Sequence, residues 1–211
     1  MRKVILRNHT YLQPFNEPAR DLRLLNKPLW LHQRDLLARY STEEREVDSG
    51  SFAEVPPDPV EQIVYRDNLF FDRYYIDAFL EEAIRSNRPR RAAFAKDNTA
   101  FVNHALPLAH GYTQMGDLYL TDLWYFPQGP VSDAEPLVID WQPREIGYYR
   151  IPEYMATERG QLTFQVPVRA CLLIESWVHI FIADAIFGQF ARIARTEQRI
   201  AHDLRFKLEV L

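Results

Sequence analysis

Three cations near the N-terminus are spaced so that they could bind one anion. Arg20, Arg23 and Lys27 follow a short apolar stretch, Val4-Ile5-Leu6, and precede Pro28, a residue suited to the first turn of a helix. A loop between a strand and a helix gathers positive potential at the carboxyl end of the strand, where open α/β sheets bind ligands. Three solvated surface cations would give the same pattern.

A second polar group follows the apolar stretch Ile63-Val64-Tyr65. Here Arg66, Asp67 and Asn68 end a predicted buried strand. By residue type alone, Asp67 could cap a turn, because the Asp-Asn pair suits turns.

Both stretches resemble motifs of sugar-1-phosphate nucleotidyltransferases. The run from Leu22 to Leu29 is similar to the K-P-L element that opens a helix in this family, and the run from Val64 to Phe71 is similar to its strand followed by G-D-N. The resemblance implies that Arg23 and Lys27 neutralise phosphate charge in catalysis. It also implies that Arg20 and Asn68 bind the nucleotide and that Asp67 holds Mg²⁺, although a turn-capping role would explain Asp67 equally well. A second metal carboxylate is not distinguished among three candidates, which are Asp117, Asp122 and Asp140.

The family's glycine-rich phosphate loop is absent from this sequence. No glycine precedes Gly50, and Arg66 replaces the glycine before Asp67. Backbone without glycine cannot wrap a triphosphate closely. We therefore expect a nucleotidyltransferase-like domain that binds a nucleoside triphosphate, sugar-1-phosphate or sugar nucleotide with reduced or lost catalysis. The alternative is a non-catalytic scaffold or oligomerisation domain that works through its C-terminal helices.

Hydrophobic periodicity predicts the elements that would position these residues. It predicts strands at 3–7, 61–65, 91–95, 117–125 and 162–166, helices at 27–40 and 72–86, and a polar surface excursion at 41–54. The order strand, helix, strand over residues 61–95 indicates a parallel crossover. The predicted fold is a three-layer α/β domain with a nucleotidyltransferase-like, Rossmann-like mixed sheet and a C-terminal helical extension.

The last fifth of the chain changes character. Residues 170–190 are almost all apolar and residues 192–211 are amphipathic, so we divide the chain into a domain at 1–168 and a helical extension at 169–211. We expect this extension to form a homo-oligomer or to contact a further module. The whole chain resembles the N-terminal half of bacterial proteins that continue into a left-handed β-helix of the acyltransferase type, although no hexapeptide repeat occurs here. A third hypothesis, which rests only on residues 170–211, is a membrane-associated amphipathic protein.

Composition excludes several other classes of function. The net charge of −4 over 211 residues argues against broad nucleic-acid binding, and 47% hydrophobic residues suffice for a sizeable core. The single cysteine, Cys171, lies in an apolar run and is expected to be a buried thiol.

The N-terminus has no signal-peptide pattern, so we expect a cytoplasmic protein. The i, i+4 pair of Glu175 and His179 is interpreted as a buried hydrogen bond rather than a catalytic pair.

Overall fold

A computed structural model describes residues 1–48, 50–147 and 163–202 of the chain. Its centre is a sheet whose strands are β1 (Arg2–Leu6), β6 (Glu43–Val47), β7 (Gln62–Arg66), β9 (Arg90–Ala95), β10 (Thr113–Met115), β11 (Leu118–Phe126) and β12 (Glu135–Val138). The strand order is β12-β9-β11-β7-β1-β6, and β10 pairs with β11. Strands β6, β1 and β7 are parallel, β11 is antiparallel to both of its neighbours, and β12 is parallel to β9.

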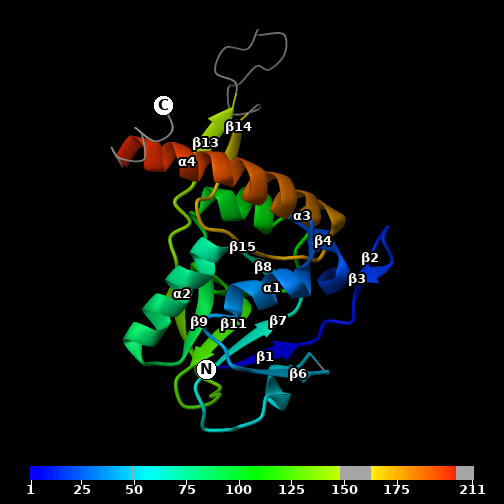
Figure 1. The fold of residues 1–211 in the computed structure, drawn as a ribbon, viewed down its shortest axis with the longest axis vertical. Helices are drawn as coiled ribbons and strands as arrows, with labels where there is room; N and C mark the ends of the chain where they lie inside the picture. Colours follow the sequence, from blue (N-terminus) through cyan, green and yellow to red (C-terminus); the bar gives the residue numbers. More distant parts are fainter. Residues whose placement is uncertain (49, 148–162, 203–211) are drawn as a thin grey trace.

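Helices cover the sheet and extend the molecule at its C-terminal end (Figure 1). They are α1 (Leu29–Leu37), α2 (Arg73–Ser86), the single π-turn segment η3 (Phe101–Ala105), α3 (Trp177–Phe181), the π-helix η5 (Ile182–Phe190) and α4 (Ala191–His202). The predicted mixed α/β fold with a central mixed sheet and a C-terminal helix is confirmed. The crossover from β7 through α2 to β9 is parallel, as predicted, and the antiparallel β11 lies between the two strands.

Short two-stranded pairings complete the fold. They are β2 (Tyr11–Leu12) with β3 (Glu17–Pro18), β4 (Arg23–Leu24) with β5 (Lys27–Pro28), β8 (Leu69–Phe71) with β15 (Cys171–Leu173), and β13 (Arg144–Gly147) with β14 (Thr163–Val166). Two further short helical turns lie at Ala19–Asp21 and Phe52–Glu54.

The sheet separates two cores of unequal size. The larger one lies under the helices and includes buried aromatic residues of α2, β9 and η5, among them Phe79, Phe94 and Phe187. The smaller one lies on the opposite face, where Val64 and Trp124 pack with the partly buried Phe52. Among the described residues, no helix is long and apolar enough to cross a membrane.

The sequence-based assignments of two longer stretches were wrong. Residues 41–54 were expected to be a surface excursion, but Glu43–Val47 form β6, a parallel edge strand paired with β1. Residues 170–190 were expected to be one helix, but Cys171–Leu173 form β15, which pairs with β8, and α3 begins only at Trp177. The predicted amphipathic helix extends over 191–202, and its predicted continuation to residue 211 lies outside the described residues.

The C-terminal helix α4 is attached to the start of α2 by a buried ion pair. Arg195 donates to the Asp72 carboxylate at 3.1 Å and to the Val168 carbonyl oxygen at 3.0 Å, and its guanidinium lies over the Tyr74 ring. Asp72 also caps α2, since its carboxylate accepts the N–H of Tyr75 at 2.8 Å. Burial raises the pKa of Asp72 to about 6, although Arg195 acts in the opposite direction.

This raised pKa predicts a stability that depends on pH. The folded state binds a proton at Asp72 more tightly than the unfolded state, so the stabilising contribution is present at low pH and is lost as the pH rises through 6. Urea unfolding gives the free energy of unfolding at pH 5 and at pH 7. For the wild type, the increase from pH 7 to pH 5 should be about 1 kcal/mol larger than for Asp72→Asn. Asparagine keeps the helix cap. Parallel pH profiles of the two proteins would contradict the shift.

Candidate functional site

The carboxyl ends of the parallel strands β6, β1 and β7 carry a cluster of charged side chains. Asp67, which directly follows β7, is only 1% exposed. Its carboxylate lies 3.3 Å from Nε of Arg7 and 3.4 Å from Nη1 of Arg20, and it accepts the backbone N–H of Asn8 at 2.8 Å. Both arginines also pair with Glu46 of β6, at 2.7 and 3.2 Å. Two guanidiniums and two carboxylates therefore form one network.

Burial and charge act against each other in this network. Burial raises the pKa of Asp67, and the Asn8 N–H and the two guanidiniums lower it only in part. Partial burial acts to raise the pKa of Glu46 as well, but its hydrogen bonds from Arg7 and Arg20 outweigh burial and lower the pKa. Both cations of this cluster are thus already engaged by carboxylates of the chain itself.

The residues around Asp67 do not fit Mg²⁺. The ion prefers several oxygen ligands in octahedral geometry, whereas the Asp67 carboxylate faces two guanidiniums. Within residues 1–48, 50–147 and 163–202, no group of three His, Cys, Asp or Glu side chains is arranged to hold a metal ion. Asp122, one of the second candidates, pairs with Arg66 and Arg91.

Asn68 and a residue that the sequence did not suggest hold the turn after β7. The Asn68 side chain is buried and donates to the Ile174 carbonyl oxygen at 3.2 Å, which links the turn to the end of β15. Gln33 of α1 is also buried, and its amide donates to the carbonyl oxygens of Asp67 and Leu69. Because each of these amides bonds to backbone, both residues support the turn rather than face an open site.

The other two predicted residues lie in the β4–β5 hairpin. Lys27 does not begin the helix; it pairs across the hairpin with Leu24, and its ammonium lies 2.7 Å from the Asp35 carboxylate of α1. The Arg23 guanidinium makes one long hydrogen bond, 3.5 Å, to the Asn26 carbonyl oxygen. Of the five predicted residues, the structure brings Arg20 and Asp67 into contact and places Arg23 and Lys27 elsewhere in the fold.

Arg23 lines a cavity of about 360 Å³ between the hairpin and the C-terminal helices. Three aromatic rings on this cavity are strongly exposed, with 47% for Phe15, 54% for Trp177 and 59% for Phe181. The remaining lining residues are Asn26, Ile180 and Asp184. A guanidinium, an amide and a carboxylate around exposed rings can bind a flat or ring-shaped polar molecule.

A second cavity, of about 460 Å³, shares the lining residues Asn26 and Asp184 with the first. It adds the cation Arg192 and the amide Gln189, together with Leu25 and Ile193. We call the two cavities together the hairpin groove. Asp184 and Arg192 could not be identified as site residues from the sequence, because more than 150 residues of chain separate them from the hairpin.

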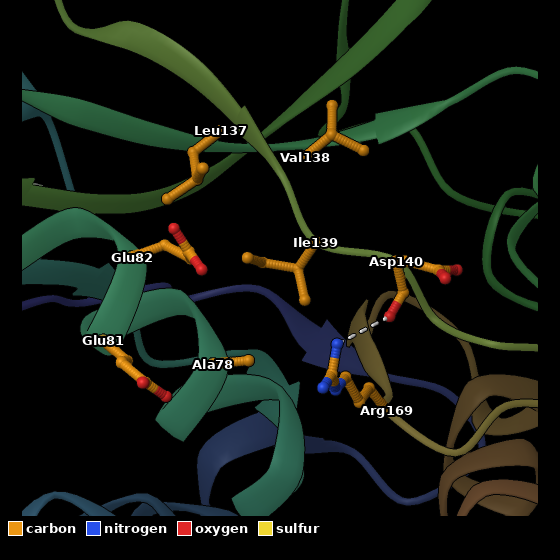
Figure 2. Close-up of a pocket in the computed structure, with 8 residues that line it drawn as sticks. All are labelled: Ala78, Glu81, Glu82, Leu137, Val138, Ile139, Asp140 and Arg169. Carbon is orange, nitrogen blue, oxygen red and sulfur yellow. Dashed lines mark hydrogen bonds between the residues drawn. The ribbon is translucent and has the colours of Figure 1, made fainter. Parts of the chain in front are cut away.

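A third cavity, of about 280 Å³, lies between α2 and the end of β12 (Figure 2). Its charged lining side chains are Glu81, Glu82, Asp140 and a single cation, Arg169, which donates to the Asp140 carbonyl oxygen at 3.4 Å. Three carboxylates around one guanidinium would repel a phosphate. This cavity is therefore less suited to a nucleotide than the hairpin groove.

Two other sequence interpretations are confirmed. Cys171 is buried and free. His179 is fully buried, its Nδ1 accepts the Glu175 backbone N–H at 3.1 Å, and its Nε2 lies 2.7 Å from the Pro107 carbonyl oxygen. The Glu175 carboxylate instead accepts the backbone N–H groups of His110 and Gly111. His179 is thus a satisfied structural histidine.

Comparison with known proteins gives a distant likeness. No family model and no curated protein matches the chain. A crystal structure of a candidate glucose-1-phosphate thymidylyltransferase from Bacillus anthracis in complex with sucrose is 10% identical, over 89% of this chain and 95% of that chain, with a TM-score of 0.45. The structure of the inositol-1-phosphate CTP transferase from T. maritima is 8% identical, over 89% of this chain and 96% of that chain, with a TM-score of 0.43. Likenesses at this level assign no function to the chain.

Proposed function

We propose that the chain binds a sugar nucleotide or a related nucleoside phosphate in the hairpin groove, without metal-dependent nucleotidyl transfer. The observation that carries the proposal is the cavity that Arg23 shares with the exposed rings of Trp177 and Phe181. Aromatic rings stack on a base or on the apolar face of a sugar, and a guanidinium matches phosphate geometry.

The two halves of the groove suit the two ends of such a ligand. The aromatic cavity would hold the ring, and the Asp184 and Asn26 side chains offer an acceptor and an amide for hydroxyl groups. Arg23 places one cation in the first cavity and Arg192 places one in the second. Phosphate groups that join the sugar and the nucleoside of the ligand would then lie between two positive charges. The groove therefore supplies stacking, hydrogen bonds and charge for one elongated anion.

The Asp67 network supports the part of the proposal that concerns catalysis. Phosphoryl transfer depends on a metal ion and on cations free to neutralise charge in the transition state. Arg7 and Arg20 instead neutralise Asp67 and Glu46, and the chain has no glycine before Gly50 to form a phosphate loop. The roles of Arg20 and Asn68 in this proposal are to support the sheet edge rather than to contact nucleotide.

A thermal-shift titration with UTP, CTP, dTTP, UDP-glucose and dTDP-glucose, each with MgCl₂ or with EDTA, tests the proposal. A ligand at 100 times its dissociation constant should stabilise the fold by about 2.7 kcal/mol, with or without the metal. Arg23→Ala should weaken binding about tenfold, since a charged hydrogen bond contributes roughly 1.5 kcal/mol. Lys27→Ala, which removes a cation of the same hairpin outside the groove, should bind as the wild type.

No stabilisation by any of these ligands would refute the proposal, and stabilisation that requires magnesium would restore the catalytic interpretation. The second candidate function is self-association through the C-terminal helices. It is favoured by the exposure of Trp177, Phe181 and Ile193, at 54%, 59% and 53%. Sedimentation velocity on the same samples separates the two functions, because a dimer that dissociates in Ile193→Lys without ligand would support the second.

A further inference from the structure

The tip of the β4–β5 hairpin has a backbone conformation that its sequence does not favour. Leu25 and Asn26, the two residues between the strands, have φ angles of 52° and 67°. Two-residue hairpin loops with both residues at positive φ prefer asparagine, aspartate and glycine. Asn26 meets this preference, whereas leucine at positive φ is uncommon and strained. Contacts from elsewhere must therefore hold Leu25.

Those contacts come from η5, the segment between α3 and α4 (Figure 1). The Leu25 backbone N–H donates to Oδ1 of Asp184 at 2.7 Å, although 159 residues separate the two. One helical turn further on, Gly188 leaves room for the leucine side chain. A Cβ atom at position 188 would come within 2.3 Å of Cδ2 of Leu25. Asp184 accepts the Leu25 N–H and Gly188 leaves space for the Leu25 side chain, and both residues belong to η5.

We propose that Asp184 and Gly188 are positioning residues that set the β4–β5 hairpin, so that the docking of η5 controls the affinity of the hairpin groove. Both Arg23 and Asn26 line the groove. Asn26 is one of the two tip residues and Arg23 belongs to the adjoining strand β4, so a shift of the tip moves both. This inference rests on the proposed function of the groove. Coupling between two sites is reciprocal, so a bound ligand would in turn hold η5 against the hairpin.

The positioning part can be tested without any ligand. Hydrogen exchange of the full chain, followed on peptides that cover residues 22–29, reports whether the Leu25 amide is protected. Gly188→Ala should increase exchange at this amide, because the new methyl group forces the Leu25 side chain to shift and lies 3.1 Å from the Ala183 carbonyl oxygen. The matched control is Ala185→Gly, a substitution in the same helix at a half-buried position that lines none of the three cavities. It should lower Tm and leave hairpin exchange as in the wild type.

The coupling part is tested by calorimetric titration with the sugar nucleotide that stabilises the wild type best. Gly188→Ala should weaken binding at least tenfold although residue 188 lies outside the lining, and Ala185→Gly should not. Unchanged exchange at Leu25 in Gly188→Ala would overturn the positioning role. Increased exchange with unchanged affinity would overturn the coupling.

The failure of the proposed function has a different signature. If no nucleotide or sugar nucleotide binds the wild type, the coupling to ligand falls with it, while hydrogen exchange still decides the positioning role. Should Gly188→Ala not fold, Asp184→Ala and Asp184→Asn serve instead. Asparagine keeps an oxygen that can accept the Leu25 N–H, so only the alanine variant should lose protection at Leu25. Equal loss in both would contradict the hydrogen bond's role.

Discussion

Replacing Phe187 with alanine is expected to lower the free energy of unfolding by about 4 kcal/mol. Phe187 of η5 is fully buried, and its ring lies edge-on to Trp141 at 5.6 Å between centroids. Trp141 in turn contacts Phe94 of β9 and Phe101 of η3. The substitution would leave a large cavity where the C-terminal helices meet the sheet core, and the surrounding rings could close it only in part.

Phe181→Ala is the matched control for this prediction. The residue type and the helical stretch are the same, but Phe181 is 59% exposed, so its loss should change stability by less than about 0.5 kcal/mol. Urea unfolding of both variants gives the comparison. The result also tests the proposed division of the chain at residue 168. A small effect of Phe187→Ala would support a separate helical extension, and a large one would show that η5 shares the core of the first domain.

Replacing Asp67 with alanine should destabilise the chain by roughly 2–3 kcal/mol. The Asn8 N–H would lose its acceptor, and Arg7 and Arg20 would both lose their buried carboxylate partner and keep the exposed Glu46. Asp67→Asn, which retains an oxygen for the Asn8 N–H, should cost less. Removal of Asp35 from its exposed pair with Lys27 should leave stability unchanged, because surface pairs contribute little.

Magnesium discriminates between the two roles of Asp67. With the carboxylate engaged by guanidiniums, MgCl₂ should leave Tm of the wild type unchanged in a thermal-shift measurement. A tolerated Asp67→Ala substitution, combined with stabilisation of the wild type by magnesium, would show instead that Asp67 serves a metal site and that the ion pairs are secondary.

Elements with clear periodicity could be predicted from the sequence, and two others could not. The helix at 72–86 has an apolar stripe and an aspartate at its N-cap, and the structure has it at Arg73–Ser86. Strand β6 was missed because Glu43, Glu44, Arg45 and Glu46 show no alternation of apolar residues. Charged edge strands of this kind are defined by their partner, here β1. Strand β15 was missed because a short apolar run suits a buried strand and a helix equally.

The site was predictable only where it depends on local sequence. Position after a strand identified Asp67, and the structure places Arg20 beside it as part of the same edge. Glu46, which pairs with Arg20, comes from β6, and Asp184, which accepts the Leu25 N–H of the hairpin, comes from η5. The sequence patterns of these two elements did not indicate either contact. Pairing across such distances is a tertiary property, and composition and spacing carry no record of it.

The contact between Leu25 and Asp184 also sets an order of assembly. During synthesis the hairpin with Arg23 leaves the ribosome early, whereas η5 follows more than 150 residues later. The acceptor Asp184 is made only after this long stretch, and the space at Gly188 follows four residues later. Arg23 would therefore reach its final position only after η5 has been translated. Binding in the proposed groove would therefore require that η5 has emerged from the ribosome.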